Sequence, residues 1–226
     1  MCQTPLNVGD PGYAPLFAYG YGLKKGARSK LGRLDVRYPP GGCAASDVFP
    51  VYGQADRSSF PLRVRSKGQT RELGADLNAV VELPGIRAAT AQIKTQQDAK
   101  LVTWTGPASF EAHGARPLAL PPAAADKAVL RIETRVEQAP QGKVTLAMLC
   151  GARPCGQPLD VTRRFAGQAG KGAQVLKIPL GCFGARGADT PFSVSSSGPF
   201  TAAFGNIDVV GGAAGDADAL RCEDLR

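Results

Sequence analysis

The sequence predicts an all-β protein, an antiparallel β-sandwich with one short helix. Glycine and proline are abundant, with 28 and 18 among 226 residues, which indicates many turns between short elements. Short segments in which apolar and polar residues alternate recur along the chain, and this period is typical of half-buried strands. Hydrophobic residues make up 43% of the chain, enough for a sizeable core and too many for a disordered segment.

The clearest strands lie between Gln174 and Val210. Residues 175–180 form an apolar run with β-branched members, and residues 191–197 alternate apolar residues with serines. Residues 200–210 follow after the turn Gly198-Pro199. None of these segments has helical periodicity, so we expect them to close an antiparallel sandwich.

The earlier part of the chain contains further strand candidates, each bounded by turn residues. We expect strands over residues 31–36, 47–52, 60–65, 79–83, 86–94, 98–104, 108–112, 127–136 and 143–150. The polar stretch 66–74 is predicted to be a loop. Residues 159–166 form the only plausible helix, with Asp160 near its start.

Charge and hydropathy disfavour two classes of partner. The chain carries 27 Lys and Arg against 19 Asp and Glu, a net charge of +8, but the basic residues are scattered and no basic-aromatic motif accompanies them. We therefore expect no nucleic-acid partner. No apolar run approaches the length that spans a bilayer, so we expect no membrane partner.

Six cysteines accompany a single histidine, which disfavours zinc and favours disulfides. Fifteen pairings are open. Cys150 and Cys155 are close enough for a local bridge, and Cys182 is expected to close on Cys222, while the pairing of Cys2 and Cys43 stays open. The start of the chain lacks the basic segment and the apolar core of a signal peptide, although its cysteines are typical of an exported protein. We therefore expect a piece of a larger protein that is periplasmic or secreted.

Residues 12–23 read GYAPLFAYGYGL, four aromatic residues interrupted by glycines. This segment resembles the end of the second, α/β sandwich domain of glycoside hydrolase family 3 enzymes, where a Pro-Leu-Phe-x-[Tyr/Phe]-Gly-[Tyr/Phe]-Gly-Leu element occurs. Pro15 to Leu23 fill that pattern, and Leu6 to Asp10 resemble the lead-in of the bacterial exo-glucanase branch.

The rest of the chain resembles the C-terminal module of the same branch, a galactose-binding-like jelly roll. The matching features are Gln97-Asp98-Ala99 with Trp104-Thr105-Gly106, the Cys150 to Cys155 loop, Asp160-Val161-Thr162, Ile178 to Phe183 and Gly187-Ala188-Asp189. The chain departs from related modules where Ala173 or Gln174 replaces a tryptophan.

The resemblance implies two regions, residues 1–30 as the tail and linker of a glycosidase domain and residues 31–226 as the module, with the boundary within residues 24–43. The parent would be a retaining β-glucosidase or exo-glucanase, but its two catalytic carboxylates lie in segments that this chain lacks. We therefore expect a non-catalytic accessory module whose partners are the upstream catalytic domains and β-glucan oligosaccharides. The alternative is an autonomous carbohydrate-binding module for β-glucan.

Sugar-binding candidates are Trp104, the only tryptophan, with Gln97 and Asp98 near it in sequence. A core position for Trp104 is favoured over a ligand platform. The loop Lys67-Gly68-Gln69-Thr70 is a second candidate, with Gln69 reaching towards an active site, although such loops are usually only solvated.

We expect no cofactor and no catalytic residue. His113 is expected to be a solvated loop side chain. A structural calcium ion is the one bound metal that the sequence allows, with Asp189 and Asp208 as weak candidate ligands beside Asn206, although turn-capping is favoured for them. The aromatic residues within 5–23 are expected to favour self-association when they are not covered by a partner.

Overall fold

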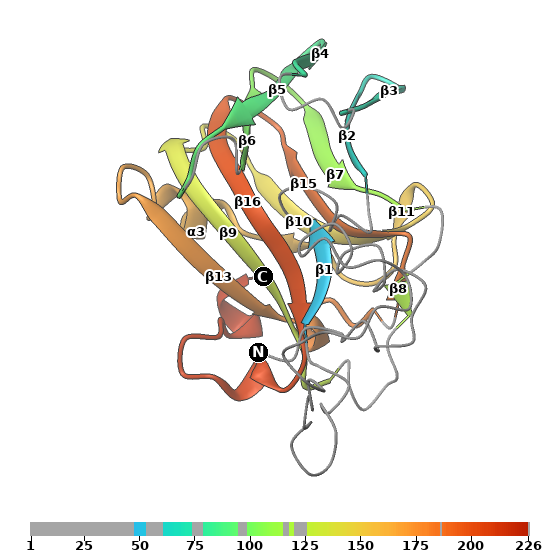
Figure 1. The fold of residues 1–226 in the computed structure, drawn as a ribbon, viewed down its shortest axis with the longest axis vertical. Coiled ribbons are helices and arrows are strands. Elements are labelled where there is room, and N and C mark those ends of the chain that lie inside the picture. The colour runs from blue at the N-terminus through green and yellow to red at the C-terminus, as the bar shows by residue number, and fades with distance from the viewer. Residues whose placement is uncertain are drawn as a thin grey trace, which may run out of the picture. The chain divides into compact units, whose positions relative to one another are not determined.

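Two antiparallel β-sheets pack face to face in a computed structural model of the chain (Figure 1). The structure describes residues 48–52, 61–73, 79–94, 99–114, 118–119, 126–185 and 187–225. All of them belong to one unit, Asp47–Arg226. The expected all-β sandwich is therefore confirmed.

The first sheet has β16, Phe200–Val210, near its centre. Its strand order is β13 (Ala173–Pro179), β9 (Val129–Gln138), β16, β6 (Ala99–Trp104), β5 (Ile86–Ala91) and β4 (Val81–Leu83), and β1 (Val48–Tyr52) also pairs with β16. Every pairing is antiparallel. The length of β16 lets it pair with β9 on one side and with β6 and then β1 on the other.

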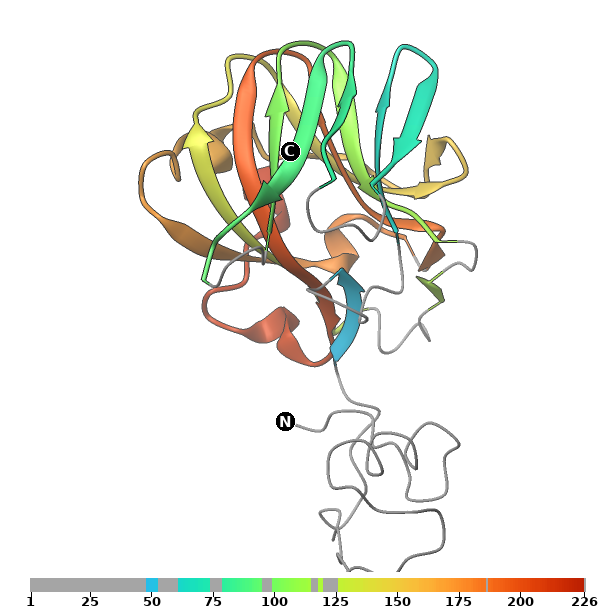
Figure 2. The ribbon, with the colours of Figure 1, turned by 45° about the horizontal axis from the view of Figure 1, so that its top comes forward.

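The second sheet is built around β15, Thr190–Ser196, and β7, Ala108–Ala112. Its strand order is β11 (Arg153–Pro154), β10 (Val144–Cys150), β15, β7, β2 (Leu62–Ser66) and β3 (Gln69–Glu72), and β12 (Leu159–Asp160) also pairs with β10. A small third sheet joins β8 (Leu118–Ala119) to β14 (Gly187–Ala188). The β2–β3 and β4–β5 hairpins lie together at one end of the sandwich (Figures 1 and 2).

Helical structure is limited to short elements. The helix α3 covers Thr162–Ala166, and 3-10 turns cover Leu180–Cys182, Ala213–Gly215 and Cys222–Leu225. No helix in the described part of the chain has the length and apolarity that crossing a membrane requires.

Aromatic side chains from both sheets and from α3 fill the centre of the core. Trp104 stacks on Phe200 with ring centroids 5.1 Å apart, and Phe165 of α3 lies 5.3 Å from the same ring. Phe204 contacts Phe110 of the opposite sheet at 5.6 Å. Since these rings are almost completely buried, they contribute much of the apolar area that holds the two sheets together.

The structure departs from the predicted elements in three places. The predicted loop 66–74 contains β3, an edge strand. The predicted helix 159–166 is divided, because Leu159 pairs with Leu146 in the second sheet and only Thr162–Ala166 is helical. The short strands β8, β11 and β14 had no counterpart in the predictions. The predicted strand 31–36 and the predicted boundary after residue 30 lie outside the described residues.

Candidate binding cleft

An open cleft of about 390 Å³ lies where the second sheet meets its end turns. It is lined by residues of β2, β7, β10 and β15 and by the turns that follow or precede these strands. Its lining residues are Arg65, Ser66, Lys67, Gly68, Pro107, Ala108, Ser109, Lys143, Thr145, Ser195, Ser196 and Ser197. Three of these side chains are cationic, none is acidic and none is aromatic.

The floor of the cleft is a row of polar residues on the outer face of the second sheet. The register places Thr145 opposite Ser195, Ser195 opposite Ser109, and Ser109 opposite Arg65. A residue adjacent to each of these on its strand points into the core and is fully buried, namely Leu146, Val194, Phe110 and Val64. Strand alternation therefore turns the polar row away from the core, and four strands that are distant in sequence build one surface.

One wall is the two-residue turn Lys67-Gly68 that joins β2 to β3. Both residues have positive φ, 48° for Lys67 and 78° for Gly68, as a type I′ hairpin turn requires. Lys67 is the only non-glycine residue with positive φ in the described part of the chain. Asparagine would suit this position better, so the lysine costs some stability and places a charge at the rim.

The opposite wall depends on two turns that approach closely. A Cβ atom at Gly142 would lie 2.6 Å from the Ser197 hydroxyl and 2.7 Å from the Gly198 amide nitrogen. The Lys143 amide donates a hydrogen bond to the Ser197 hydroxyl at 2.8 Å. Only glycine at position 142 allows this approach, and the contact fixes the backbone that carries Lys143.

A buried carboxylate, Glu111, lies near the cleft residue Arg65 but pairs more closely with Arg63. Glu111 is 0% exposed, and its Oε2 accepts a hydrogen bond from Arg63 Nε at 2.7 Å. The Ser109 hydroxyl donates to Oε1 at 2.7 Å, while Arg65 Nε lies further away, at 3.7 Å. Because Glu111 pairs closely with Arg63 and only distantly with Arg65, the Arg65 guanidinium is able to interact with a ligand in the cleft.

Lys143 has one acidic neighbour outside the lining. Its Nζ lies 3.5 Å from Asp160 Oδ2, and both side chains are partly exposed. Hydrogen bonding from the Thr162 side chain holds the pKa of Asp160 below its usual range. Partial burial raises this pKa, while the Thr162 amide and Lys143 lower it further. This exposed pair leaves Lys143 free to turn towards a ligand.

Trp104 is a core residue and not a ligand platform. Its side chain is 1% exposed, it is stacked on Phe200, and its Nε1 donates to the Ala108 carbonyl at 3.1 Å. Stacking on a sugar needs an exposed ring face, so the candidate sugar platform is wrong and the core position favoured by the sequence is correct.

The other sugar-binding candidates are only partly described. Gln69 is exposed at the start of β3, beside the turn Lys67-Gly68 but not among the residues that line the cleft. Gln97 and Asp98 lie outside the described residues. The residues that do line the cleft, such as Lys143 and Ser195, were missed because their grouping depends on strand register.

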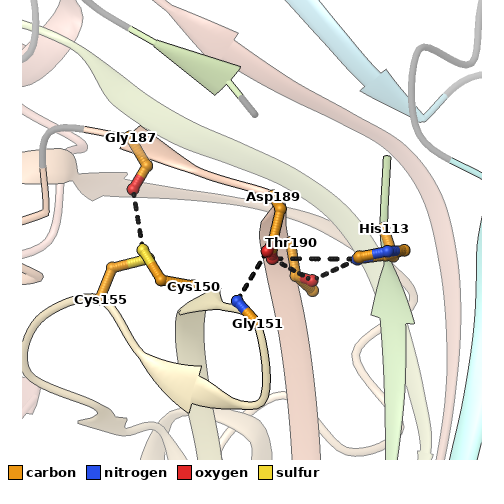
Figure 3. The surroundings of a disulfide bond; sticks show 7 residues. All are labelled: His113, Cys150, Gly151, Cys155, Gly187, Asp189 and Thr190. Atoms are coloured by element: carbon orange, nitrogen blue, oxygen red, sulfur yellow. Dashed lines mark hydrogen bonds and ion pairs between the residues drawn. A yellow bond between two sulfur atoms is a disulfide. The ribbon is translucent and has the colours of Figure 1, made fainter. Parts of the chain in front are cut away.

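The calcium candidates have other partners. Asp189 Oδ2 accepts from the Gly151 amide at 2.6 Å and its Oδ1 accepts from the Thr190 hydroxyl at 3.0 Å (Figure 3). Asp208 pairs with Arg131, with 2.5 Å between Oδ2 and Nη2. Nowhere in the described ranges do three or more His, Cys, Asp or Glu residues gather in a metal-binding group. Asn206 donates to Glu133 at 3.2 Å.

His113 is held in place beside Asp189, contrary to the expected solvated side chain. It directly follows β7, and its Nδ1 lies 2.9 Å from the Thr190 hydroxyl and 3.9 Å from Asp189 Oδ1 (Figure 3). Its side chain is 31% exposed. Since the Thr190 hydroxyl donates to Asp189, it accepts from His113, and the three residues form a chain of hydrogen bonds that ties β7 to β15.

The structure contains both disulfides that the sequence predicted. Cys150 pairs with Cys155 next to the Asp189 cluster (Figure 3), and Cys182 pairs with Cys222. The second bridge spans 40 residues and attaches the C-terminal 3-10 turn to the bend after β13. Cys2 and Cys43 lie outside the described residues.

Comparisons with known proteins agree with this architecture. A family model described as galactose-binding domain-like matches residues 60–209. The extra C-terminal domain of an exo-1,3/1,4-β-glucanase from a Pseudoalteromonas species superposes with a TM-score of 0.63, at 15% identity, over 76% of this chain and 97% of that domain.

The exo-1,3/1,4-β-glucanase itself, from the same organism, superposes with a TM-score of 0.64 at 21% identity. That match covers 96% of this chain and 26% of the glucanase, so the chain corresponds to about a quarter of that enzyme. No curated protein matches the chain. Because the family model covers most of the described sandwich, and the fold agrees with it, the chain belongs to the galactose-binding domain-like family.

Proposed function

We propose that this chain is a non-catalytic accessory module of an exo-acting β-glucan glycosidase, where it packs on the catalytic domains and shapes the substrate entrance. The observation that carries the proposal is the extent of the likeness to the exo-1,3/1,4-β-glucanase, which covers 96% of this chain. The likeness to the isolated extra domain covers 76%. The resemblance of residues 12–23 to the end of the second domain of family 3 glycosidases supports a chain that includes part of a neighbouring domain.

The carboxylates support a non-catalytic role. A retaining glycosidase needs two carboxyl groups facing each other across the scissile bond. The buried carboxylates in the described ranges are Glu111, Glu133 and Asp208. They pair with Arg63, Lys94 and Arg131, respectively. Each of these three carboxylates is thus held by a cation.

The two disulfides support a periplasmic or secreted location for the protein. Such bridges form and persist in oxidising compartments. A glycosidase that acts on β-glucan would meet its polymeric substrate in the same compartments.

The alternative is an autonomous carbohydrate-binding module for β-glucan. Binding of neutral glucans commonly uses aromatic rings as stacking platforms. Trp104 is buried, and the residues that line the cleft include no aromatic side chain. These two facts favour the accessory role.

The test uses the purified chain with an aryl β-glucoside and with neutral β-glucan oligosaccharides. We expect no turnover above buffer and no saturable binding of the neutral oligosaccharides by calorimetry. Turnover that disappears when one Asp or Glu of this chain is replaced would overturn the non-catalytic role. Saturable binding without turnover would favour the autonomous binding module instead.

A further inference from the structure

We propose that the cleft at the end of the second sheet binds the anionic group of an acidic oligosaccharide, a uronate carboxylate or a sulfate ester. The choice of a saccharide rests on the proposed function, whereas the choice of an anion rests on the cleft alone. Arg65, Lys67 and Lys143 contribute three positive charges to the lining, and the lining contains no acidic residue. Two carboxylates outside the lining pair with these cations: Glu111 lies 3.7 Å from Arg65 but 2.7 Å from Arg63, and Asp160 lies 3.5 Å from Lys143. Lys67 has no ion-pair partner in the described ranges.

The floor between these cations offers hydroxyl donors. Several cleft hydroxyls are already used, because Ser66 donates to the Pro84 carbonyl, Ser196 to the Gly198 carbonyl and Ser109 to Glu111. The Thr145 and Ser195 hydroxyls, which face each other across β10 and β15, have no hydrogen-bond partner within the described part of the chain. They are free to donate to an anionic oxygen that the three cations attract.

The charge of Lys67 is placed at a cost to the turn. A lysine with φ of 48° occupies a position that asparagine or glycine fills with less strain. Local strain at a surface residue points to a role other than stability. In this turn the strained lysine lies at the rim of the cleft.

The absence of aromatic lining residues distinguishes this cleft from sites for neutral sugars and from sites for single-stranded nucleic acids. Neutral sugars and the bases of single-stranded nucleic acids are both commonly held by stacking on aromatic rings. The cleft has cations and hydroxyls instead, which are suited to a charged oxygen group on a hydroxyl-rich ligand.

The experiment is calorimetric titration of the whole chain with five probes, of which the oligomers are of matched length. The probes are an oligomer of β-linked glucuronic acid, a sulfated β-glucan oligosaccharide, the neutral β-glucan oligosaccharide, inorganic sulfate and a single-stranded oligonucleotide. We expect saturable binding of at least one acidic oligosaccharide, with weaker binding at high ionic strength, because exposed charges are screened by salt. Whether the uronate or the sulfate probe binds identifies the source of the charge.

Paired variants separate the cleft from the general basic charge of the chain. Lys67→Asn combined with Lys143→Gln removes two cleft cations. It spares Arg65, whose loss would alter the surroundings of buried Glu111. Arg87→Gln combined with Lys127→Gln removes two exposed cations of the first-sheet side that have no ion-pair partner in the described ranges. We expect the cleft variant to lose about tenfold in affinity and the control variant to bind as the original chain does.

The thermal midpoint of the cleft variant should stay equal or rise, since asparagine suits the turn. If it falls, Lys143→Gln alone gives the same test without changing the turn, with an expected loss of about threefold. The proposal is overturned if no acidic oligosaccharide binds, if the neutral oligosaccharide, the oligonucleotide or inorganic sulfate binds as tightly, or if the control variant loses as much affinity as the cleft variant. None of these outcomes bears on catalytic turnover, so the accessory role is tested separately.

Discussion

Trp104 shows how one residue holds the two sheets together. Its ring lies between Phe200 and Phe204, and its indole N–H is satisfied by the Ala108 carbonyl. Trp104→Ala is expected to reduce the free energy of unfolding by about 3–5 kcal/mol because it leaves a cavity in the core. Urea unfolding measures this loss. Trp104→Phe, which keeps an aromatic ring, should cost less.

If Trp104→Ala instead left stability unchanged and abolished binding of an oligosaccharide, the tryptophan would be a ligand platform after all. Its 1% exposure argues against that outcome.

Asp160 makes stability depend on pH. Its pKa is lowered in the folded chain by hydrogen bonding to Thr162 and by Lys143. A group with a depressed folded pKa stabilises the fold above its unfolded pKa, and this contribution disappears as pH falls through the folded pKa. Asp160→Asn should therefore lower stability near neutral pH, by less than about 1 kcal/mol since the side chain is 34% exposed.

Denaturant unfolding at about pH 7 and about pH 2 checks this expectation, because the difference between Asp160→Asn and the original chain should vanish at the acid end. Asp126→Asn is a suitable control, as Asp126 is exposed and has no partner in the described ranges. A deficit of Asp160→Asn that persists unchanged in acid would contradict the role given to the ionised carboxylate.

At the scale of elements, the Cys182–Cys222 bridge attaches the last turn to the sandwich. A loop of 40 residues closed by this bridge corresponds to about 4 kcal/mol in the chain-entropy model. Replacing both cysteines by alanine should lower the free energy of unfolding by about 2–4 kcal/mol in denaturant titration. Replacing Cys150 and Cys155, which are separated by only 5 residues, should lower the free energy of unfolding by less. A larger loss for the short loop would contradict the loop-closure explanation.

The sequence predicted the long strands because each has one buried face and therefore a period of two. It missed β3, since Gln69 to Glu72 are exposed on both faces and carry no such period. It extended the helix too far because Leu159, Val161 and Phe165 are all apolar, although Leu159 belongs to a strand. Short strands such as β8 and β14 are too brief to produce any pattern.

The cleft could not be predicted from the sequence for a different reason. Arg65, Ser109, Thr145 and Ser195 are far apart along the chain and become neighbours only through the register of four strands. The alternating serines of residues 191–197 indicated a strand with one polar face but not what that face meets. The sequence places Lys67 only in a polar loop, because its positive φ is a property of the folded turn.

At the scale of the whole molecule, self-association through the aromatic segment at residues 12–23 stays a prediction. The described strands provide a core of their own. Each large apolar side chain that stays in water lacks the stabilisation of about 1.5–3 kcal/mol that its burial would give. Deleting residues 1–23 is expected to leave the sandwich folded and to reduce self-association, as measured by sedimentation and circular dichroism. Unfolding of residues 47–226 by this deletion would mean that the segment is an integral part of the sandwich.

The accessory role is tested most directly by the activity of the polypeptide that joins this chain to glycosidase catalytic domains, with and without residues 47–226. Two substrates are compared, an aryl β-glucoside, which occupies only the reacting site, and a β-glucan oligosaccharide, which extends through the substrate entrance. The account predicts that the deletion lowers kcat/KM for the oligosaccharide by about tenfold or more while that for the aryl β-glucoside changes little. An equal change for both substrates, or no change for either, would contradict it.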